Sequence, residues 1–496
     1  MGKDGQNVYL DRIEWEGLQS KRIIKENISS VILKDTANEI EIWRGEDYKI
    51  KAKITGVFMH GEDTLSYKGK AGEIIKPVEI TGENYHGIEK FKLEHCYIGN
   101  ESSTGAVDVS GNFYRNYSIE LMTYHVERKT NSKEEVSWLT DWYINSHKMN
   151  FFYPRLTTRK VSETFIRNRG TRNDDEDDVI FNGFNSNNSG RDYAIIDCDD
   201  IKFIIHSVPK GYEPNWSEKV GIEYRKEFGI IPDVNKKEAI SEIVSFIIGR
   251  QLIHVGSTSF SSLGYAIEDT FKNPNVDNIL SLCQKSDIPP IRLGTYETMD
   301  RIELVLKQIV PKYLKLRDEL KLNDALLRYW LSSTLPIGSN LPVLANGVEI
   351  LASAWFASNK SKVKGVYMPK SKFDNLLGKD FDEIEEKLKN VEYGDRIVRR
   401  MRNTFQLGVN ERLQFFFDEI GLKIGEVEKK AIRARNSMAH SRLSEEKERE
   451  MIYLSNAYRT LFNRILLKIL DYKDDYVDYS VLGFPEKNID KPLGDV

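Results

Sequence analysis

The order of apolar and polar residues changes character near Pro232. Before it, apolar residues alternate with polar ones, most clearly over residues 48–54, where lysines take every second position. Such alternation places the two kinds of residue on opposite faces of a β-strand. Similar runs cover residues 40–43, 117–126 and 194–205. The two aspartates at 199–200 can turn the last run back on itself, so the pattern predicts a β-sandwich or barrel-like region.

Residues 168–192 interrupt this pattern. They read NRGTRNDDEDDVIFNGFNSNNSGRD, with five consecutive acids at 174–178 and then a stretch rich in Asn, Ser and Gly. Such a segment buries little apolar area, which predicts a long mobile loop. The acids could hold a divalent ion, but a block of like charge is more typical of a solvated segment.

After Pro232 the apolar residues recur with helical spacing. Between residues 240 and 248 they return every three or four positions, behind Asn235 as the expected N-cap. A second helix is expected from about residue 298, with Pro311 kinking or ending it. Further helices are predicted near residues 323–334, 341–358, 371–390, 393–407, 411–420, 425–440 and 445–472. The last third shows no convincing strand pattern, which predicts an α-bundle.

The chain as a whole is therefore predicted to be an α+β protein. Its 496 residues are enough for two or three domains. Residues 1–315 are expected to form the first region, β-rich to about residue 232 and mixed or helical beyond it. Residues 320–496 are expected to form an all-α helical bundle.

Charge and cysteine content narrow the functional classes. The formal net charge is −4, so no overall positive field attracts nucleic acid or anionic membrane to the whole surface. Residues 321–496 carry 29 basic and 26 acidic side chains, against 43 and 50 in the residues before them, which favours the late part for polyanion chemistry. Three widely spaced cysteines predict neither a disulfide framework nor a closed zinc site, and suit a reducing cytoplasm. No stretch has the apolar length of a membrane span, so we expect no membrane partner. Because the cysteines form no closed zinc site, we also expect no metal.

One short motif in the bundle carries candidate chemistry. In RNSMAH, residues 435–440, Asn436 and His440 stand four positions apart and share one face of the predicted helix. Arg435 precedes them and Arg442 follows within half a turn. Together these residues offer a proton-transfer group, an amide that orients it and guanidinium groups for phosphate.

The distribution of histidine adds to this interpretation. Of eight histidines in the chain, only His440 lies after His254. Metal-free RNA cleavage needs a base for the ribose 2′-OH and an acid for the leaving 5′-oxygen. One histidine does not easily fill both roles, which predicts a twofold dimer that places two copies of the motif across one cleft.

A plainer interpretation treats His440 as a polar residue on a helix surface and Arg435 as part of a solvated basic cluster. For an isolated pair of this spacing the plainer interpretation would be the better one. Asn436, the helical setting and an arginine cluster one helix earlier, which includes Arg399 and Arg402, favour a functional site.

Two further motifs fit structural roles better. Asp418 and the sequence Glu428-Lys-Lys have the residue types of a metal nuclease, but that chemistry places them on a strand, whereas these lie on an amphipathic helix. Trp138, Trp142 and Tyr143 could stack on bases, but aromatic residues at this spacing are more often part of a core.

The bundle resembles the Apea-like HEPN family. The helical domain of this family carries an Arg followed after four to six residues by His, usually with Asn after the Arg, which matches Arg435, Asn436 and His440. An upstream helix like LPVLANGVEILASAWF, with an acid at the position of Glu349, and a closing helix like residues 445–472 also match. The resemblance covers about residues 320–475.

The preceding region resembles the domain often fused to such bundles in bacterial anti-phage proteins. The segments that carry this resemblance are WLTDWYINS, GIEYRKEFGIIP and VSFIIGRQLIHVGSTSF. Together the two resemblances imply a cytoplasmic endoribonuclease that forms a homodimer or a higher homo-oligomer and needs no metal or other cofactor. It would cleave host or phage RNA, with tRNA as one candidate, after a phage-derived trigger, while its N-terminal domain senses or regulates.

The resemblance implies a role for each residue of the motif. Arg435, Asn436 and His440 would be catalytic. Four residues would be second-rank helpers toward the substrate: Arg442, Arg399, Arg402 and Glu349. The alternative function is a non-catalytic HEPN module that holds RNA or a partner in the same groove.

Overall fold

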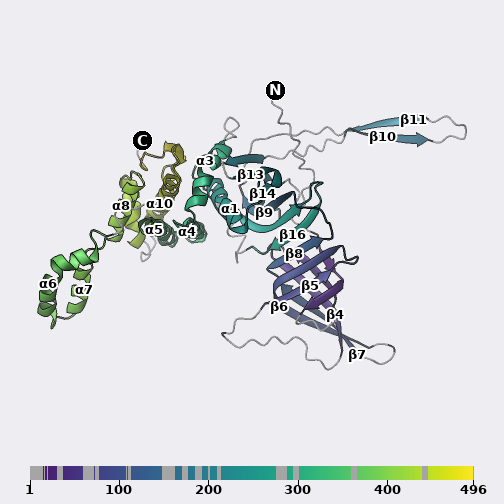
Figure 1. The fold of residues 1–496 in the computed structure, drawn as a ribbon, viewed down its shortest axis with the longest axis horizontal. Coiled ribbons are helices and arrows are strands. Elements are labelled where there is room, and N and C mark those ends of the chain that lie inside the picture. Colours follow the sequence, from purple (N-terminus) through teal and green to yellow (C-terminus); the bar gives the residue numbers. More distant parts are fainter. Residues whose placement is uncertain are drawn as a thin grey trace.

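The computed structural model describes most of the chain. The described residues are 15, 17–18, 20–30, 37–59, 72, 77–107, 109, 113–147, 162–169, 177–184, 193–198, 201–208, 214–274, 287–293, 301–358, 366–437 and 445–494. Within them the fold is α+β, as predicted: one large antiparallel sheet fills the N-terminal part and helices follow it. In Figure 1 the strands gather on one side, α4, α5, α8 and α10 on the other, and α1 and α3 lie between.

The large sheet has 14 strands. Twelve of them follow one another as neighbours in this order: β1 (Arg22–Ile24), β3 (Ala37–Arg44), β4 (Ile50–Met59), β7 (Phe113–Met122), β6 (Glu89–Val107), β8 (His125–Thr130), β16 (Ala266–Lys272), β15 (Ile253–Phe260), β9 (Trp138–Ser146), β14 (Glu218–Arg225), β13 (Ile201–Ser207) and β12 (Tyr193–Cys198). β2 (Glu26–Ser30) pairs with β5 (Val78–Glu83), which pairs with β6. The long β6 therefore joins the early strands to the later ones.

The helices form a continuous layer from the sheet into the bundle. They are α1 (Val234–Ile248), α3 (Arg301–Leu316), α4 (Leu322–Thr334), α5 (Asn340–Ala357), α6 (Lys370–Leu388), α7 (Gly394–Arg402), α8 (Val409–Glu419), α9 (Glu426–Ser437) and α10 (Glu445–Ile469). α3 packs on α1 and β12, α1 also contacts α4, and α5 contacts α4, α8, α9 and α10. The largest apolar cluster accordingly runs from strand residues such as Phe203 through Phe246 to Phe462 in α10. Among the described helices, none has the length and apolar character to cross a membrane.

The strand predictions before Pro232 are largely confirmed. In β4 the apolar Ile50, Ala52 and Ile54 are buried while Lys51 is exposed, as the alternation indicates. β12 and β13 pair in the expected antiparallel register. The run 117–126 is two strands, because β7 ends at Met122 and β8 begins at His125.

The predicted mobile loop at 168–192 is wrong in part. β10 (Ser162–Arg169) pairs along its whole length with β11 (Asp177–Phe184), and this two-stranded ribbon projects from the sheet in Figure 1. The TFI and VIF triplets within these two strands favour extended backbone. Most of the acidic run 174–178 lies outside the described residues.

Four strands that follow Pro232 were not predicted from the sequence. β15 and β16 sit in the middle of the sheet although they follow Pro232, and β17 (Asp475–Val477) pairs with β18 (Glu486–Asn488) beside the bundle. β15 is rich in Ser, Thr and Gly and has a bulge, so its apolar period is weak. β17 and β18 have three residues each, too few for a period to show.

Two helix-end predictions need correction. The N-cap of α1 is Asp233 rather than Asn235: its carboxylate accepts a hydrogen bond from the backbone N–H of Lys236 at 2.8 Å. Pro311 does not end α3, which continues to Leu316. Proline leaves the carbonyl four residues earlier without its helical donor. Here the Cys198 thiol donates to that carbonyl, Lys307 O, at 3.8 Å.

The two helices α6 and α7 form a hairpin of their own. Phe373 and Phe381 of α6 form a small separate apolar cluster with Phe405, which follows α7. Figure 1 places this hairpin at the far end of the molecule, beyond α8. α7 ends at Arg402, earlier than the predicted 407.

Candidate functional site

Arg435 lies where four helices of the bundle meet. It occupies the last turn of α9 and is 7% exposed. One guanidinium nitrogen, Nη1, is 3.1 Å from Glu349 Oε1 on α5, and Nη2 donates to Asn410 Oδ1 on α8 at 3.3 Å. Tyr458 on α10 lies beside them. Burial raises the pKa of its hydroxyl well above the usual range, and the nearby Arg435 charge opposes that rise.

The Arg435 guanidinium is not fully satisfied. Although Glu349 is close, Nη1 makes no hydrogen bond of good geometry with any described residue. Nε of Arg412, on α8, is also buried without such a bond, while its Nη2 donates to Ser353 Oγ on α5 at 3.3 Å. Buried polar groups normally find partners, so spare N–H groups on two arginines are unusual. Both arginines contact the same helix, α5, where Glu349 is the acid that pairs with Arg435.

A shallow groove runs along the exposed side of α5. Its volume is about 340 Å³, and it is lined by Glu349, Asn346 and Ser353 together with Lys321 and Asp324 from the start of α4. Glu349 is 39% exposed at its side chain and therefore connects the buried Arg435 to this groove. Ile350, Ala354 and Ala357 complete its lining, so the groove is open and of mixed polar and apolar character.

The structure places some of the predicted site residues and not others. It brings Arg435 and Glu349 into contact. Asn436 lies in α9, but its side chain is outside what the structure describes, as are His440 and Arg442 entirely. The central prediction, an imidazole near the Arg435 guanidinium, therefore stays a prediction.

The two arginines predicted from the preceding helix sit in the α6–α7 hairpin. Arg402 pairs with Asp382 at 2.6 Å and with Glu385 at 2.8 Å, so its charge is already neutralised. Arg399 is exposed on α7. The hairpin packs around its own cluster, whereas Arg435 packs among α5, α8 and α10.

Glu428, which the sequence analysis compared with a metal-nuclease motif, has a structural role. Glu428 is fully buried in α9 and pairs with the fully buried Arg464 of α10. Its other contacts are the backbone N–H groups of Gly425 and Leu493. Glu428 thus connects the last described residues of the chain to the bundle. Across the described ranges, no cluster of three or more His, Cys, Asp or Glu side chains is arranged to hold a metal ion.

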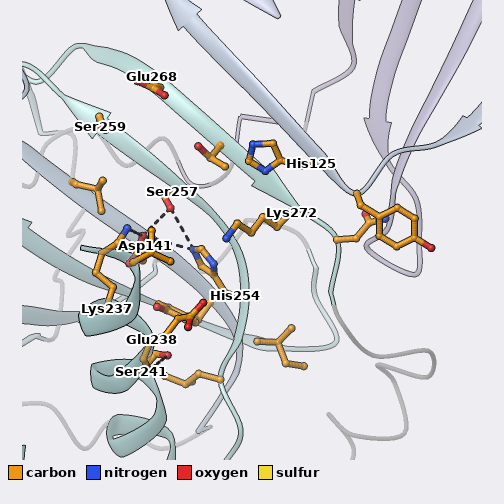
Figure 2. A pocket seen from close by; sticks show the side chains of 18 of the residues that line it. His125, Asp141, Lys237, Glu238, Ser241, His254, Ser257, Ser259, Glu268 and Lys272 are labelled. Atoms are coloured by element: carbon orange, nitrogen blue, oxygen red, sulfur yellow. Dashed lines mark hydrogen bonds and ion pairs between the residues drawn. The ribbon is translucent and has the colours of Figure 1, made fainter. Parts of the chain in front are cut away.

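A second polar site, which we term the Asp141 cavity, lies between α1 and the sheet. Its volume is about 610 Å³, and its floor is formed by β9, β15, β16 and the start of β8 (Figure 2). Asp141 is 1% exposed there, yet its carboxylate accepts from Lys237 Nζ of α1 at 3.0 Å and from Ser257 Oγ at 2.7 Å. Burial alone would raise the pKa of Asp141, but His254, Lys237 and Ser257 lower it to about 2. Asp141 is therefore ionised near neutral pH, with Lys237 beside it as the balancing charge.

A bulge in β15 brings His254 and Ser257 into this cavity together. Residues three apart on a regular strand face opposite sides. The ladder between β15 and β9 shifts register between His254 and Gly256, so both side chains reach the same side. Gly256 is required at this point, because a Cβ there would lie 2.3 Å from the Thr270 carbonyl oxygen.

These residues have the types of a serine hydrolase triad but not its geometry. A triad needs one imidazole nitrogen on the acid and the other on the serine. Here the same nitrogen, His254 Nε2, is nearest both Ser257 Oγ, at 3.4 Å, and Asp141 Oδ1, at 3.7 Å. The serine also donates directly to the carboxylate (Figure 2). The arrangement therefore does not activate a nucleophile and instead suits binding.

Sequence reasoning missed the Asp141 cavity. One signal was available: Asp141 stands between aromatic and aliphatic residues in WLTDWYINS, a strand buried on both faces. A carboxylate in such a place needs partners. Those partners come from residues about 96 to 116 positions away in sequence, so the tertiary fold alone identifies them.

Comparison with known proteins identifies no relative. No family model, no curated protein and no solved structure matches the chain. Function therefore has to be argued from the residues and their geometry.

Proposed function

We propose that the protein is a metal-independent endoribonuclease of the HEPN type, a cytoplasmic, toxin-like effector of anti-phage defence. The observation that carries the proposal is the Arg435 guanidinium, which is buried among four helices and pairs with Glu349, while its Nη1 has no well-aligned hydrogen bond to any described residue. In the sequence it directly precedes Asn436 and stands five positions before His440. A guanidinium group is suited to bind a phosphate, and this one lies next to Glu349, which lines the open groove on α5.

The proposed reaction is attack of a ribose 2′-OH on the adjacent phosphorus. A base removes the 2′-OH proton, the new P–O bond closes a 2′,3′-cyclic phosphate, and an acid gives a proton to the departing 5′-oxygen. Arg435 stabilises the charge that develops on the phosphate oxygens. Glu349 holds the guanidinium in place from α5. His440 is the proton-transfer group, and Asn436 orients it or the substrate.

Two copies of the chain would complete the site. The bundle contains one histidine, whereas the reaction uses both a base and an acid. A twofold dimer supplies the second imidazole from the partner subunit. RNA, with tRNA as one candidate, is the proposed substrate, and a phage product is the proposed trigger.

The same features also fit a module that binds RNA without cutting it. Arg412 and Arg435 together carry one more positive charge than Glu349 balances, which favours a phosphate backbone in either case. The two functions differ only in whether new RNA ends appear.

The test is cleavage of end-labelled RNA by the purified full-length protein in excess EDTA. We expect products with 2′,3′-cyclic phosphate and 5′-hydroxyl ends. Arg435→Ala should slow cleavage by roughly 10²- to 10³-fold, as expected when one charge-stabilising donor is removed. Arg433→Ala removes an exposed arginine two positions away in α9 and should leave the rate unchanged.

His440→Ala serves as a second variant in case Arg435→Ala disturbs the packing of α9. It should abolish cleavage while RNA binding persists. If wild-type protein binds RNA but produces no new ends, the non-catalytic module is the correct function. Full activity of both His440→Ala and Arg435→Ala would refute the proposal.

A further inference from the structure

The α6–α7 hairpin stands apart from the rest of the bundle. Among the described elements, α6 and α7 pack on each other, around their own cluster of phenylalanines. The largest apolar cluster includes no described residue of either helix. Figure 1 shows the hairpin reaching outward beyond α8. Most of its surface is therefore open to solvent.

The helix α7 presents three arginines on one face. Arg396, Arg399 and Arg400 follow the spacing i, i+3 and i+4, which brings side chains together on one side of a helix. All three are exposed, and none forms an ion pair with any residue in the described ranges. An exposed face with three unpaired guanidinium groups is complementary to a polyanion.

The acids of the hairpin do not neutralise this face. Asp382 and Glu385 of α6 reach α7, but both pair with Arg402. Within the described structure, no other acid of α6 forms an ion pair with α7. Glu392 and Asp395 are the acids closest in sequence, and they too lie beyond ion-pair distance of the three arginines. Three arginines beside these two acids leave a net positive charge.

An exposed aromatic ring borders the three arginines. Tyr393 directly precedes α7 and is 61% exposed. The Arg396 guanidinium lies over its ring, 5.2 Å from the centroid. Aromatic rings beside basic side chains are typical of surfaces that bind single-stranded nucleic acid, because the rings stack on bases while the cations contact phosphates. An acidic protein would use the charges but would have no need of the ring.

The chain leads from this face to the Arg435 site within a short distance. Asn410, which accepts a hydrogen bond from Arg435, follows Arg402 by eight positions. A fully extended chain covers at most about 3.6 Å per residue, so the Cα atoms of Arg402 and Asn410 lie within roughly 30 Å of each other. Roughly ten base pairs of a nucleic-acid duplex span that distance. One RNA molecule can therefore contact both places.

From these observations we infer that the α6–α7 hairpin is a docking surface for RNA. Arg396, Arg399 and Arg400 hold phosphates, and Tyr393 stacks on an unpaired base. The inference rests on the proposed function only in naming RNA as the polyanion. It adds a second contact surface, separate from the groove beside Arg435.

The test is fluorescence anisotropy of a labelled RNA stem-loop titrated with the full-length protein. The probe carries 2′-O-methyl riboses, which lack the attacking hydroxyl, so binding is measured without cleavage. The triple variant Arg396→Gln, Arg399→Gln, Arg400→Gln should weaken binding by roughly 10- to 100-fold. It should also reduce the slope of log affinity against log salt concentration by about 2, because two or three phosphate contacts are lost. Tyr393→Ala should weaken binding by roughly tenfold and leave the slope unchanged.

The matched control removes the same charge from the other helix of the hairpin. The triple variant Lys372→Gln, Lys379→Gln, Lys387→Gln replaces three exposed lysines of α6. It should change the affinity for the probe little.

Two outcomes would overturn the inference. The first is equal affinity of the arginine and lysine variants for the probe. The second is weaker self-association of the arginine variant in sedimentation velocity with its RNA affinity intact, since the face would then bind acids of a second copy.

The outcome for the nuclease is read separately. If wild-type protein cleaves RNA and the arginine variant binds the probe as the wild type does, only the docking surface is refuted. If the arginine variant binds weakly and wild-type protein produces no new RNA ends, the docking surface stands and the nuclease is refuted.

Discussion

At the residue scale, the two polar sites differ in how their charges are compensated. Asp141 is buried but has three partners from α1 and β15, which make its ionised form the favoured one. Arg435 is buried with a single acid and an amide, and its Nη1 has no well-aligned hydrogen bond within the described part of the chain. A fully compensated charge supports the fold, whereas an incompletely compensated one is available to a ligand.

The pKa of Asp141 leads to a prediction about pH. Its folded-state pKa of about 2 lies below the usual 3.8, so ionised Asp141 stabilises the fold above about pH 4. That stability is lost as the pH falls from about 4 towards 2, and it amounts to about 2 kcal/mol. Asp141→Asn should therefore lower the free energy of unfolding at pH 7 by on the order of 2 kcal/mol, as measured by urea unfolding followed by tryptophan fluorescence.

The difference between Asp141→Asn and the wild type should shrink as the pH approaches 2, where the wild-type carboxylate is also protonated. Asp197→Asn, which removes an exposed strand acid, is the control and should change stability little. A difference that stays constant from pH 7 to pH 2 would show that the partners of Asp141 do not favour its charged form.

At the scale of elements, a buried ion pair between Glu428 and Arg464 connects α9 to α10. Arg464 donates to Glu428 and to the backbone carbonyl oxygens of Lys423 and Ile489, while Glu428 accepts from Leu493 N–H. Both side chains are fully buried. The pair therefore joins the loop before α9, α10 and the last described residues in one network.

Breaking this network should be costly. Glu428→Ala leaves the Arg464 charge buried without its acid, which is expected to reduce stability by about 3 to 5 kcal/mol. Glu426→Ala removes a first-turn acid of the same helix that is 81% exposed at its side chain, and should change stability little. Thermal unfolding of both variants measures the contrast. Equal unfolding midpoints for the two would mean that the buried pair does not stabilise the bundle.

At the scale of the whole molecule, the later strands of the sheet share one core with the bundle. Phe246 of α1 lies edge-on to Tyr329 of α4, with ring centroids 6.1 Å apart, and Tyr329 stacks on Phe462 of α10. Leu316 and Leu320, between α3 and α4, are both buried. Apolar packing is thus continuous across residues 315–320, where the sequence predicts a boundary between two regions.

This continuity predicts that residues 320–496 by themselves are less stable than the same residues in the full chain. Without α1 and α3, the apolar side chains of α4 that face them become exposed. Expressed alone, this fragment should aggregate or unfold at a midpoint several degrees lower, as light scattering and calorimetry would report. A fragment as soluble and stable as the intact protein would show that the bundle is an independent domain.

The sequence by itself determined the α+β class, most helices and the buried faces of strands such as β4, because local apolar periodicity reports which side of an element meets the core. It also indicated Arg435 and Glu349, which the fold brings into contact. It could not determine β15, whose bulge breaks the period, or the continuation of α3 past Pro311, which the distant Cys198 thiol permits.

Only the tertiary structure showed that the Asp141 cavity exists and which side chains meet in it. Its charge balance depends on which side chains meet across α1 and four strands, and pairs such as Lys237 with Asp141 are remote in sequence. Hydrogen bonds and ion pairs act over a few ångströms, so the partners of Asp141 can be identified only once the fold has placed α1 and β15 beside β9.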